Sequence, residues 1–172
     1  MIFSELAQAR YSCRKFLPKP VETEKLEQIL EAARTAPTGV NAQPFRLLVI
    51  NTPESIAKLE TCSPNVFQAG TAIVILGEVT EAWANDIGMS ICGIDVGIVA
   101  THMALQATEL GLATCMVGRF DSMKLRETFA IPENYTPMLM LPIGYPAPEG
   151  APSERHFKRK SLDELVSYNT LG

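Results

Sequence analysis

The sequence lacks the patterns that mark the common nucleotide, metal and hydrolase sites. Neither a GxGxxG turn nor a GxxxxGKS or GxxxxGKT loop occurs in its 172 residues, so a bound nucleotide would not be held by a Rossmann or P-loop turn. The four cysteines are scattered without CxxC or CxxH spacing, which argues against a zinc site and a disulfide framework. Residues 88–92 miss the last glycine of a GxSxG elbow, and neither of the two histidines has a visible nucleophile or ligand partner. Hydrolase chemistry and a bound metal are therefore not expected.

Basic residues and long apolar runs are also scarce. Lys and Arg number 15 against 19 Asp and Glu, a formal net charge of −4, which argues against a nucleic-acid or anionic-membrane partner. The apolar run at residues 138–143 is too short and proline-bounded to span a bilayer. Residues 1–10 lack the basic start and apolar stretch of a secretory signal, and unpaired cysteines suit a reducing compartment. We therefore expect a cytoplasmic protein that binds neither nucleic acid nor membranes.

The pattern of expected helices and strands predicts an α+β fold. Residues 23–34 show the clearest amphipathic helical pattern, and further helices are expected at residues 53–62 and 121–129. Strands are expected at residues 46–50, 72–79, 114–117 and 137–143. Because these elements mix without strict βαβ alternation, we expect one domain over residues 1–172, with a central antiparallel or mixed sheet flanked by helices.

Residues 90–118 form the stretch around which the rest of the chain must fold. Asp95 and Glu109 are its only acidic residues and it has no Lys or Arg, so a helix here is apolar on nearly every face and must be buried. One narrow polar stripe is expected, made by Asp95, His102, Gln106 and Glu109. Gly111 is expected to end the helix. Because so short a chain cannot cover this helix on every side, we expect a second subunit to supply part of the cover.

Two segments are candidates for holding a ligand. Arg10, Ser12 and Arg14 alternate, so an extended segment would place two guanidinium groups and a hydroxyl on one side, which suits an anion such as a phosphate. The loop at residues 36–45 is rich in Pro, Gly, Asn and Gln and could hold its backbone groups rigidly towards a planar polar ligand. The alternative interpretations are a solvated basic edge for the first segment and a simple helix-to-strand connection for the second.

The C-terminal segment carries a basic cluster, Lys158-Arg159-Lys160, immediately before a helix. That helix is predicted to begin with a capping box formed by Ser161 and Glu164. We expect it to dock on the core through the apolar side chains of Leu162, Leu165 and Val166. Docking would fix the position of the basic cluster, which could then complete an anion site.

Four motifs occur in one order along almost the whole chain. They are Arg10-x-Ser12-x-Arg14-x-Phe16, residues 36–45 with the sequence APTGVNAQPF, residues 111–118 with the pattern GLxTCxxG, and residues 141–146 with the sequence LPIGYP. Together they resemble the FMN-dependent nitroreductase family. The resemblance implies a nitroreductase-like α+β fold and a homodimer with the long central helices at its interface. It also implies two FMN molecules bound between the subunits.

The resemblance assigns cofactor-binding roles by position. Arg10 and Ser12 would hold the FMN phosphate with help from the C-terminal cluster, Arg14 would reach the N1 and C2 carbonyl edge of the flavin, and the backbone N–H of Gly118 would face flavin N5. Arg119 stands where the commoner family pattern has a second glycine. The implied cofactor-binding set is Arg10, Tyr11, Ser12, Arg14, Pro37, Thr38, Gly39, Asn41, Gly118, Arg119, Lys158 and Arg159. Some of the ring-lining residues at positions 37–41 would come from the partner subunit.

The implied function is an FMN-dependent NAD(P)H oxidoreductase. Such an enzyme would reduce nitroaromatics, quinones or similar small acceptors by a ping-pong cycle, with hydride transfer through flavin N5 and NADH or NADPH as the donor. No catalytic side chain and no metal is required, because the cofactor carries the redox chemistry. The alternatives are a flavin reductase or dehalogenase of the same superfamily, or a flavin-binding protein without fast turnover.

Overall fold

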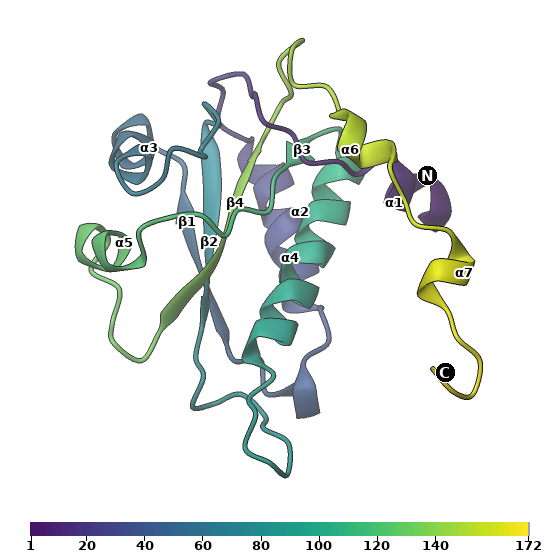
Figure 1. Ribbon diagram of the computed structural model, residues 1–172. Coiled ribbons are helices and arrows are strands. Elements are labelled where there is room, and N and C mark those ends of the chain that lie inside the picture. Colours follow the sequence, from purple (N-terminus) through teal and green to yellow (C-terminus); the bar gives the residue numbers. More distant parts are fainter. Residues whose placement is uncertain (172) are drawn as a thin grey trace.

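A four-stranded antiparallel sheet forms the centre of the computed structural model, which describes residues 1–171. Its strands are β1 (Phe45–Ile50), β2 (Thr71–Gly77), β3 (Ala113–Thr114) and β4 (Thr136–Gly144), in the spatial order β1-β2-β4-β3 (Figure 1). β2 is buried along its whole length, because it pairs with β1 on one side and β4 on the other and is covered on both faces. The sheet is antiparallel throughout, one of the two arrangements that the sequence predicted.

Helices cover both faces of this sheet. α2 (Thr23–Arg34) and α4 (Cys92–Glu109) pack on one face, and α3 (Pro53–Glu60) and α5 (Ser122–Thr128) lie on the other (Figure 1). The alternation of side chains along β2 explains the two cores, because Ile73 and Ile75 join the cluster under α2 and α4, whereas Val74 joins the cluster under α3 and α5. The predicted α+β layering and helix positions are confirmed. No helix within residues 1–171 is long and apolar enough to cross a membrane.

The helix α4 is the longest element, and it confirms the predicted helix in the central stretch with its buried inner face. It ends at Glu109, and Gly111 follows in the left-handed region with φ 76°, as a helix-terminating glycine does. Its inner face is fully buried, but Ile94 is 59% exposed on the outer face, and Gly93 and Thr101 are exposed beside it. One chain therefore leaves an apolar strip of α4 uncovered.

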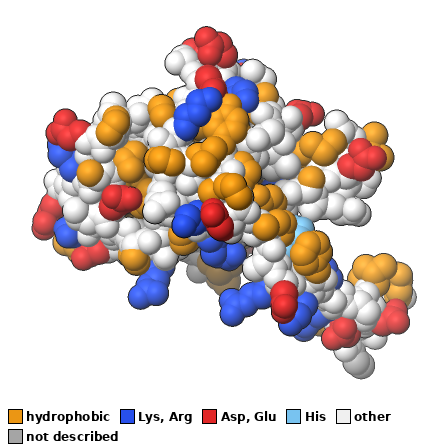
Figure 2. Space-filling view, turned by 90° about the horizontal axis from the view of Figure 1, so that it is seen from above, with side chains coloured by type: hydrophobic (Ala, Val, Ile, Leu, Met, Phe, Trp, Pro, Cys, Tyr) orange, Lys and Arg blue, Asp and Glu red, His pale blue; other side chains and the backbone are white. Residues whose placement is uncertain are grey.

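The expected docking of the C-terminal helix is wrong for this single chain. α6 (Glu154–Phe157) and α7 (Leu162–Leu165) are single turns, and the capping box of Ser161 and Glu164 forms as predicted. Leu162, however, is 76% exposed, and the segment projects away from the body with hydrophobic side chains showing along it (Figure 2). One helical turn offers little apolar area, so local capping fixes the helix but does not fix its place on the core.

The chain between α1 (Phe3–Ala9) and α2 crosses one end of the sheet. Ser12 forms a parallel bridge to Thr114, Phe16 forms an antiparallel bridge to Pro146, and the backbone N–H of Cys13 donates to the oxygen of Thr114 at 2.9 Å. The Phe16 side chain is buried. Residues 10–16, which we call the N-terminal arm, therefore lie in an extended conformation fixed by the sheet.

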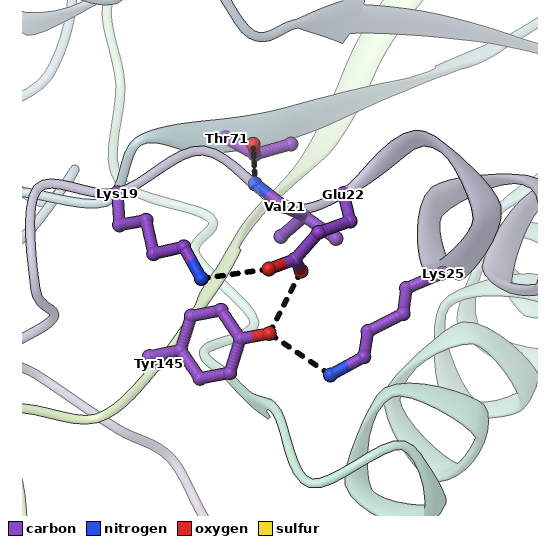
Figure 3. A network of polar contacts seen from close by, with 6 residues as sticks. All are labelled: Lys19, Val21, Glu22, Lys25, Thr71 and Tyr145. Atoms are coloured by element: carbon purple, nitrogen blue, oxygen red, sulfur yellow. Dashed lines mark hydrogen bonds and ion pairs between the residues drawn. The ribbon is translucent and has the colours of Figure 1, made fainter.

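A polar network anchors the end of this crossing segment (Figure 3). Lys19 Nζ and the hydroxyl of Tyr145 both donate to the carboxylate of Glu22 at 2.7 Å, and Lys25 Nζ donates to the Tyr145 oxygen at 2.9 Å. The hydrogen bond from Lys19, followed by that from Tyr145, lowers the pKa of Glu22 to about 2. The network ties the segment that precedes α2 to the loop after β4.

Candidate functional site

A cavity of about 180 Å³ lies between the N-terminal arm and the segment around α6. Three of its lining residues are the alternating set of the arm, Arg10, Ser12 and Arg14. The other side comes from about 140 residues later in the sequence, and its lining residues are Ser153, Arg155, His156 and Arg159. Four guanidinium groups and two hydroxyl groups therefore line one small space, which we call the arginine cavity.

Backbone pairing explains why the arm presents these side chains together. An extended strand points alternate side chains to the same side, so the bridge from Ser12 to Thr114 places Arg10 and Arg14 beside Ser12 in the cavity. Tyr11, between Arg10 and Ser12 in the sequence, is half-buried and does not line the cavity. Its ring packs edge-on against His156, with the ring centroids 6.3 Å apart, which fixes α6 beside the arm.

The charges of the arginine cavity are not balanced by nearby carboxylates. The ion pairs found in residues 1–171 join Lys19 with Glu22, Arg34 with Glu31, and Lys58 with Glu54, so none involves an arginine of the cavity. The contacts of Arg159 and Arg14 are to backbone oxygens, such as the 3.0 Å bond from Arg159 Nη1 to the oxygen of Lys158. Guanidinium groups without acidic partners suit a phosphate, which accepts charge-assisted bonds from several donors. The phosphate of FMN fits this donor set.

Two cysteines near the cavity are buried: Cys13 in the arm itself, and Cys115 next to Thr114, to which the arm is bonded. Burial raises the pKa of Cys13 and of Cys115, so both are neutral thiols near pH 7. Cys13 also belongs to the small core cluster that contains Phe16. All four cysteines of the sequence are buried and free of disulfides, as expected for residues that serve in packing.

The second predicted segment forms a tight loop at residues 38–43, which includes the 3-10 turn η1 (Gly39–Asn41). Val40, Asn41 and Gln43 all have positive φ, at 46°, 58° and 51°. Two side-chain acceptors hold the loop: Asp95 Oδ1 accepts the Gly39 N–H at 2.9 Å, and Thr38 Oγ1 accepts the Gln43 N–H at 3.0 Å. The site is tight at Gly39, because a Cβ there would lie 2.5 Å from the Cδ1 of Ile91, and that side chain would have to move to admit a larger residue.

Gly118 and Arg119, which were also predicted to contact the cofactor, belong to neither the arginine cavity nor the 38–43 loop. Val117 forms a bridge to Met140 of β4, and Gly118 and Arg119 follow it at the surface, where both are exposed. A Cβ built on Gly118 would meet no heavy atom within 4 Å, so the space on the side-chain side of this residue is open. The backbone oxygen of Arg119 accepts a hydrogen bond from the Ser63 hydroxyl at 2.7 Å. This bond holds the segment that follows Val117 in place.

The 38–43 loop lies at one end of α4, and the N-terminal arm and α6, whose residues line the arginine cavity, lie at the other (Figure 1). The loop is bonded to Asp95 in the first turn of the helix, whereas the arm is bonded to Thr114, five residues beyond the helix end. An α-helix rises about 1.5 Å per residue, so the 18 residues of α4 span about 27 Å. The two predicted halves of the site are therefore not brought together within one chain.

The comparison with protein families agrees with this architecture. The model described as the nitroreductase family matches residues 7–63 and 57–145, which hold the arm, the loop and β4. The chain belongs to the nitroreductase family. This nitroreductase-family chain thus carries the arm and the loop in the part of the sequence that the family shares.

Similar proteins support the assignment at both the sequence and the fold level. A nitroreductase family protein of Clostridium difficile 630 is 46% identical, with a TM-score of 0.92, and the match covers 99% of this chain and 100% of that one. An FMN-dependent nitroreductase from another Clostridium difficile strain is 27% identical, with a TM-score of 0.80 and coverages of 96% and 98%. A Bacillus subtilis protein named as an NAD(P)H FMN reductase is 28% identical, over 84% of this chain and 66% of its own length.

Sequence reasoning missed part of this candidate site. Arg155 lines the cavity although it was not predicted, whereas Lys158, which was, does not line it. The available signal was a further Arg at position 155, four residues before Arg159. The bond from Gly39 to Asp95 joins residues 56 positions apart, and no local pattern marked it.

Proposed function

We propose that this protein is an FMN-dependent NAD(P)H oxidoreductase that reduces nitroaromatics, quinones or similar small acceptors. When bound, FMN would supply the redox chemistry, taking hydride at N5 from NADH or NADPH and passing it to the acceptor in a ping-pong cycle. The observation that carries the proposal is the cluster of four guanidinium groups around a cavity of about 180 Å³, none of which forms an ion pair within residues 1–171. Membership of the nitroreductase family and the relatives named for FMN and NAD(P)H support it.

The roles of the chain's own residues follow from their chemistry. Arg10, Ser12 and Arg159 would hold the phosphate, which carries about two negative charges. Arg14 would place a positive charge at the pyrimidine edge, where it favours the reduced flavin. The loop at residues 37–41 would line the ring with Pro37, Thr38, Gly39 and Asn41, and the Gly118 N–H would face N5 beside Arg119. Tyr11 would hold α6 in place, and Lys158 would contribute from the edge.

We propose that the active form is a homodimer with one flavin in each of two sites between the subunits. The separation of the loop and the arginine cavity supports this, since about 27 Å is too long for the ring and phosphate of one FMN to bridge within one chain. The uncovered strip of α4 and the exposed apolar C-terminal segment are further support, because both are surfaces that a second copy could cover. Each subunit would be a single domain of residues 1–172.

Absorbance, mass and turnover test the proposal together. Purified protein is expected to be yellow, to release FMN on denaturation and to sediment as a dimer. A protein that stays colourless after incubation with FMN contradicts the cofactor assignment, and a flavin-loaded monomer contradicts the shared site. NADH or NADPH oxidation is then measured with menadione, nitrofurazone and free FMN as acceptors.

Free-flavin reduction is the second candidate function, favoured by the similarity to the Bacillus subtilis FMN reductase. Turnover with free FMN that exceeds turnover with menadione and nitrofurazone by about tenfold, or about 1.4 kcal/mol in activation free energy, would select it. Rapid reoxidation by acceptors without rapid reduction by NAD(P)H would instead indicate a flavin-binding protein without fast turnover. Cytoplasmic localisation stays a prediction, as does the absence of nucleic-acid and membrane partners.

A further inference from the structure

Asp95 is the only buried acidic side chain among the described residues and belongs to neither the arginine cavity nor an ion pair. It is 1% exposed and lies in the first turn of α4. Its Oδ1 accepts the Gly39 N–H at 2.9 Å, while its Oδ2 is buried and has no hydrogen-bond partner within residues 1–171. Burying a carboxylate with one bond to a neutral donor is unfavourable, so its presence needs an explanation other than core stability.

The loop that Asp95 contacts has a conformation that its own sequence does not favour. Val40 and Gln43 are not glycines, yet both lie in the left-handed region, and a β-branched residue such as Val40 is strained there. Val40 is also 77% exposed, so packing of its side chain does not hold the backbone in place. Side-chain hydrogen bonds hold the conformation instead: Thr38 Oγ1 accepts the Gln43 N–H within the loop, and Asp95 provides the bond that reaches the loop from α4.

We propose that Asp95 is the positioning residue of the 38–43 loop, whose carboxylate fixes the Gly39 amide and thereby aims the loop backbone at the flavin ring. The second half of this inference rests on the proposed function, whereas the first concerns the protein without ligand. Asp95 acts through Gly39 and need not touch the cofactor itself. Since the outer face of α4 is the strip proposed to meet the second subunit, the same helix would set both the interface and the loop.

Hydrogen exchange of the ligand-free protein tests the first half. Asp95→Ala removes the acceptor, whereas Asp95→Asn keeps an oxygen for the Gly39 N–H and loses no bond at the unpartnered Oδ2. The Gly39 amide and its neighbours to residue 43 are expected to exchange at least about tenfold faster in Asp95→Ala and less than about threefold faster in Asp95→Asn. Asp95→Ser, whose shorter side chain does not reach Gly39, is measured in parallel and should behave like Asp95→Ala.

Two results of that experiment would overturn the inference. Unchanged exchange in both Asp95→Ala and Asp95→Ser would show that the loop holds itself. Equal acceleration in Asp95→Asn and Asp95→Ala would assign the effect to the lost negative charge near the start of α4 and not to the bond with Gly39. Thr52→Ala is the matched control, since it removes the side-chain oxygen that caps α3 through the Ser55 N–H at 3.3 Å. It should lower stability without changing exchange in the loop.

Titration of apoprotein with FMN and riboflavin tests the second half. Because the loop is proposed to meet the ring, Asp95→Ala should weaken both ligands by about the same factor, at least about tenfold, while Asp95→Asn restores most of the affinity. Fast loop exchange with unchanged affinity for both ligands would refute the role towards the flavin. If the unmodified protein binds no flavin at all, the proposed function fails, and the exchange result still decides whether Asp95 positions the loop.

Discussion

The arginine cavity and the 38–43 loop are built by opposite means. The cavity is lined by Arg side chains that form no ion pair with any described carboxylate, and its two walls come from segments about 140 residues apart in the sequence. The loop is made of backbone groups in a left-handed conformation, held by Thr38 Oγ1 and the buried carboxylate of Asp95. Both lie at the ends of α4, so one helix sets their separation.

This difference indicates two kinds of recognition. Long Arg side chains around an open space can adapt to a mobile, strongly charged group, and they gain most of their binding energy from charge. Backbone N–H and C=O groups that internal hydrogen bonds hold in fixed positions suit a planar ligand, because the polar atoms along its edge also have fixed positions. Changes at the cavity should therefore be selective for the phosphate, and changes at the loop should not distinguish ligands with and without it.

The largest expected effect comes from removing charge at the cavity. Arg159→Ala should weaken FMN binding about tenfold to a hundredfold, because a charge-assisted hydrogen bond contributes about 1.5 to 3 kcal/mol. Riboflavin, which lacks the phosphate, should bind as before. Fluorescence titration of apoprotein with both ligands measures this, and an equal loss for the two would mean that Arg159 acts on the fold or the ring.

Lys158→Ala is the matched control for this variant. It removes a positive charge from the neighbouring position, but Lys158 does not line the cavity. Its effect on FMN affinity should stay below about threefold, the contribution of a screened surface charge. A loss as large as that of Arg159→Ala would show that net charge, and not contact in the cavity, decides the affinity.

The Arg14→Ala variant tests whether Arg14 acts on the phosphate or on the ring of the flavin. Arg14 lines the cavity with Arg10, yet the family resemblance assigns it to the pyrimidine edge of the ring. Arg14→Ala is expected to lower the two-electron reduction potential by about 30 mV, equivalent to about 1.4 kcal/mol, because the reduced flavin loses a favourable charge. An equilibrium titration against a reference dye measures the potential. An unchanged potential with a selective loss of FMN affinity would place Arg14 on the phosphate.

A smaller change in flavin affinity is expected when a hydrogen bond within the 38–43 loop is removed. Thr38→Val keeps the side-chain shape but removes the oxygen that accepts the Gln43 N–H at 3.0 Å. One neutral hydrogen bond contributes about 0.5 to 1.5 kcal/mol, so FMN and riboflavin should both bind about twofold to tenfold more weakly. A loss confined to FMN would contradict the division between the two regions.

The smallest expected effect is on the stability of the fold, and it concerns the polar network of Glu22 and Tyr145 before α2. The folded-state pKa of Glu22 is lowered from 4.5 to about 2, so its contribution to stability is present above about pH 4.5 and is lost as the pH falls towards 2. Melting temperatures of the native protein should therefore fall more steeply across this range than those of Glu22→Gln. Glu54→Gln is the comparison, because Glu54 pairs with Lys58 on one exposed helix and ties no segments together. Equal pH profiles for all three proteins would show that the network around Tyr145 does not stabilise the fold.

Much of the fold was predictable because its signals are local. The helix ends agree with the predictions where caps are present: Asp121 accepts the Lys124 N–H at 2.9 Å, Thr52 begins α3 with Pro53 in the first turn, and Gly111 ends α4. The alternation of Arg10, Ser12 and Arg14 likewise predicted that they would face one space, and they line one cavity. In each case, neighbours within a few residues determine the conformation.

The sequence by itself determined most of the elements, the buried character of the inner face of α4 and the shared orientation of Arg10, Ser12 and Arg14 in the arm, because periodicity and residue type act over short distances. Only the tertiary structure decided that Arg155 joins the cavity, since the packing of Tyr11 against His156 places α6 there. It also decided that Asp95 holds Gly39 and that the exposed C-terminal segment leaves the body. These outcomes depend on contacts between residues far apart in the sequence, and no local pattern specifies which distant partner a side chain will meet.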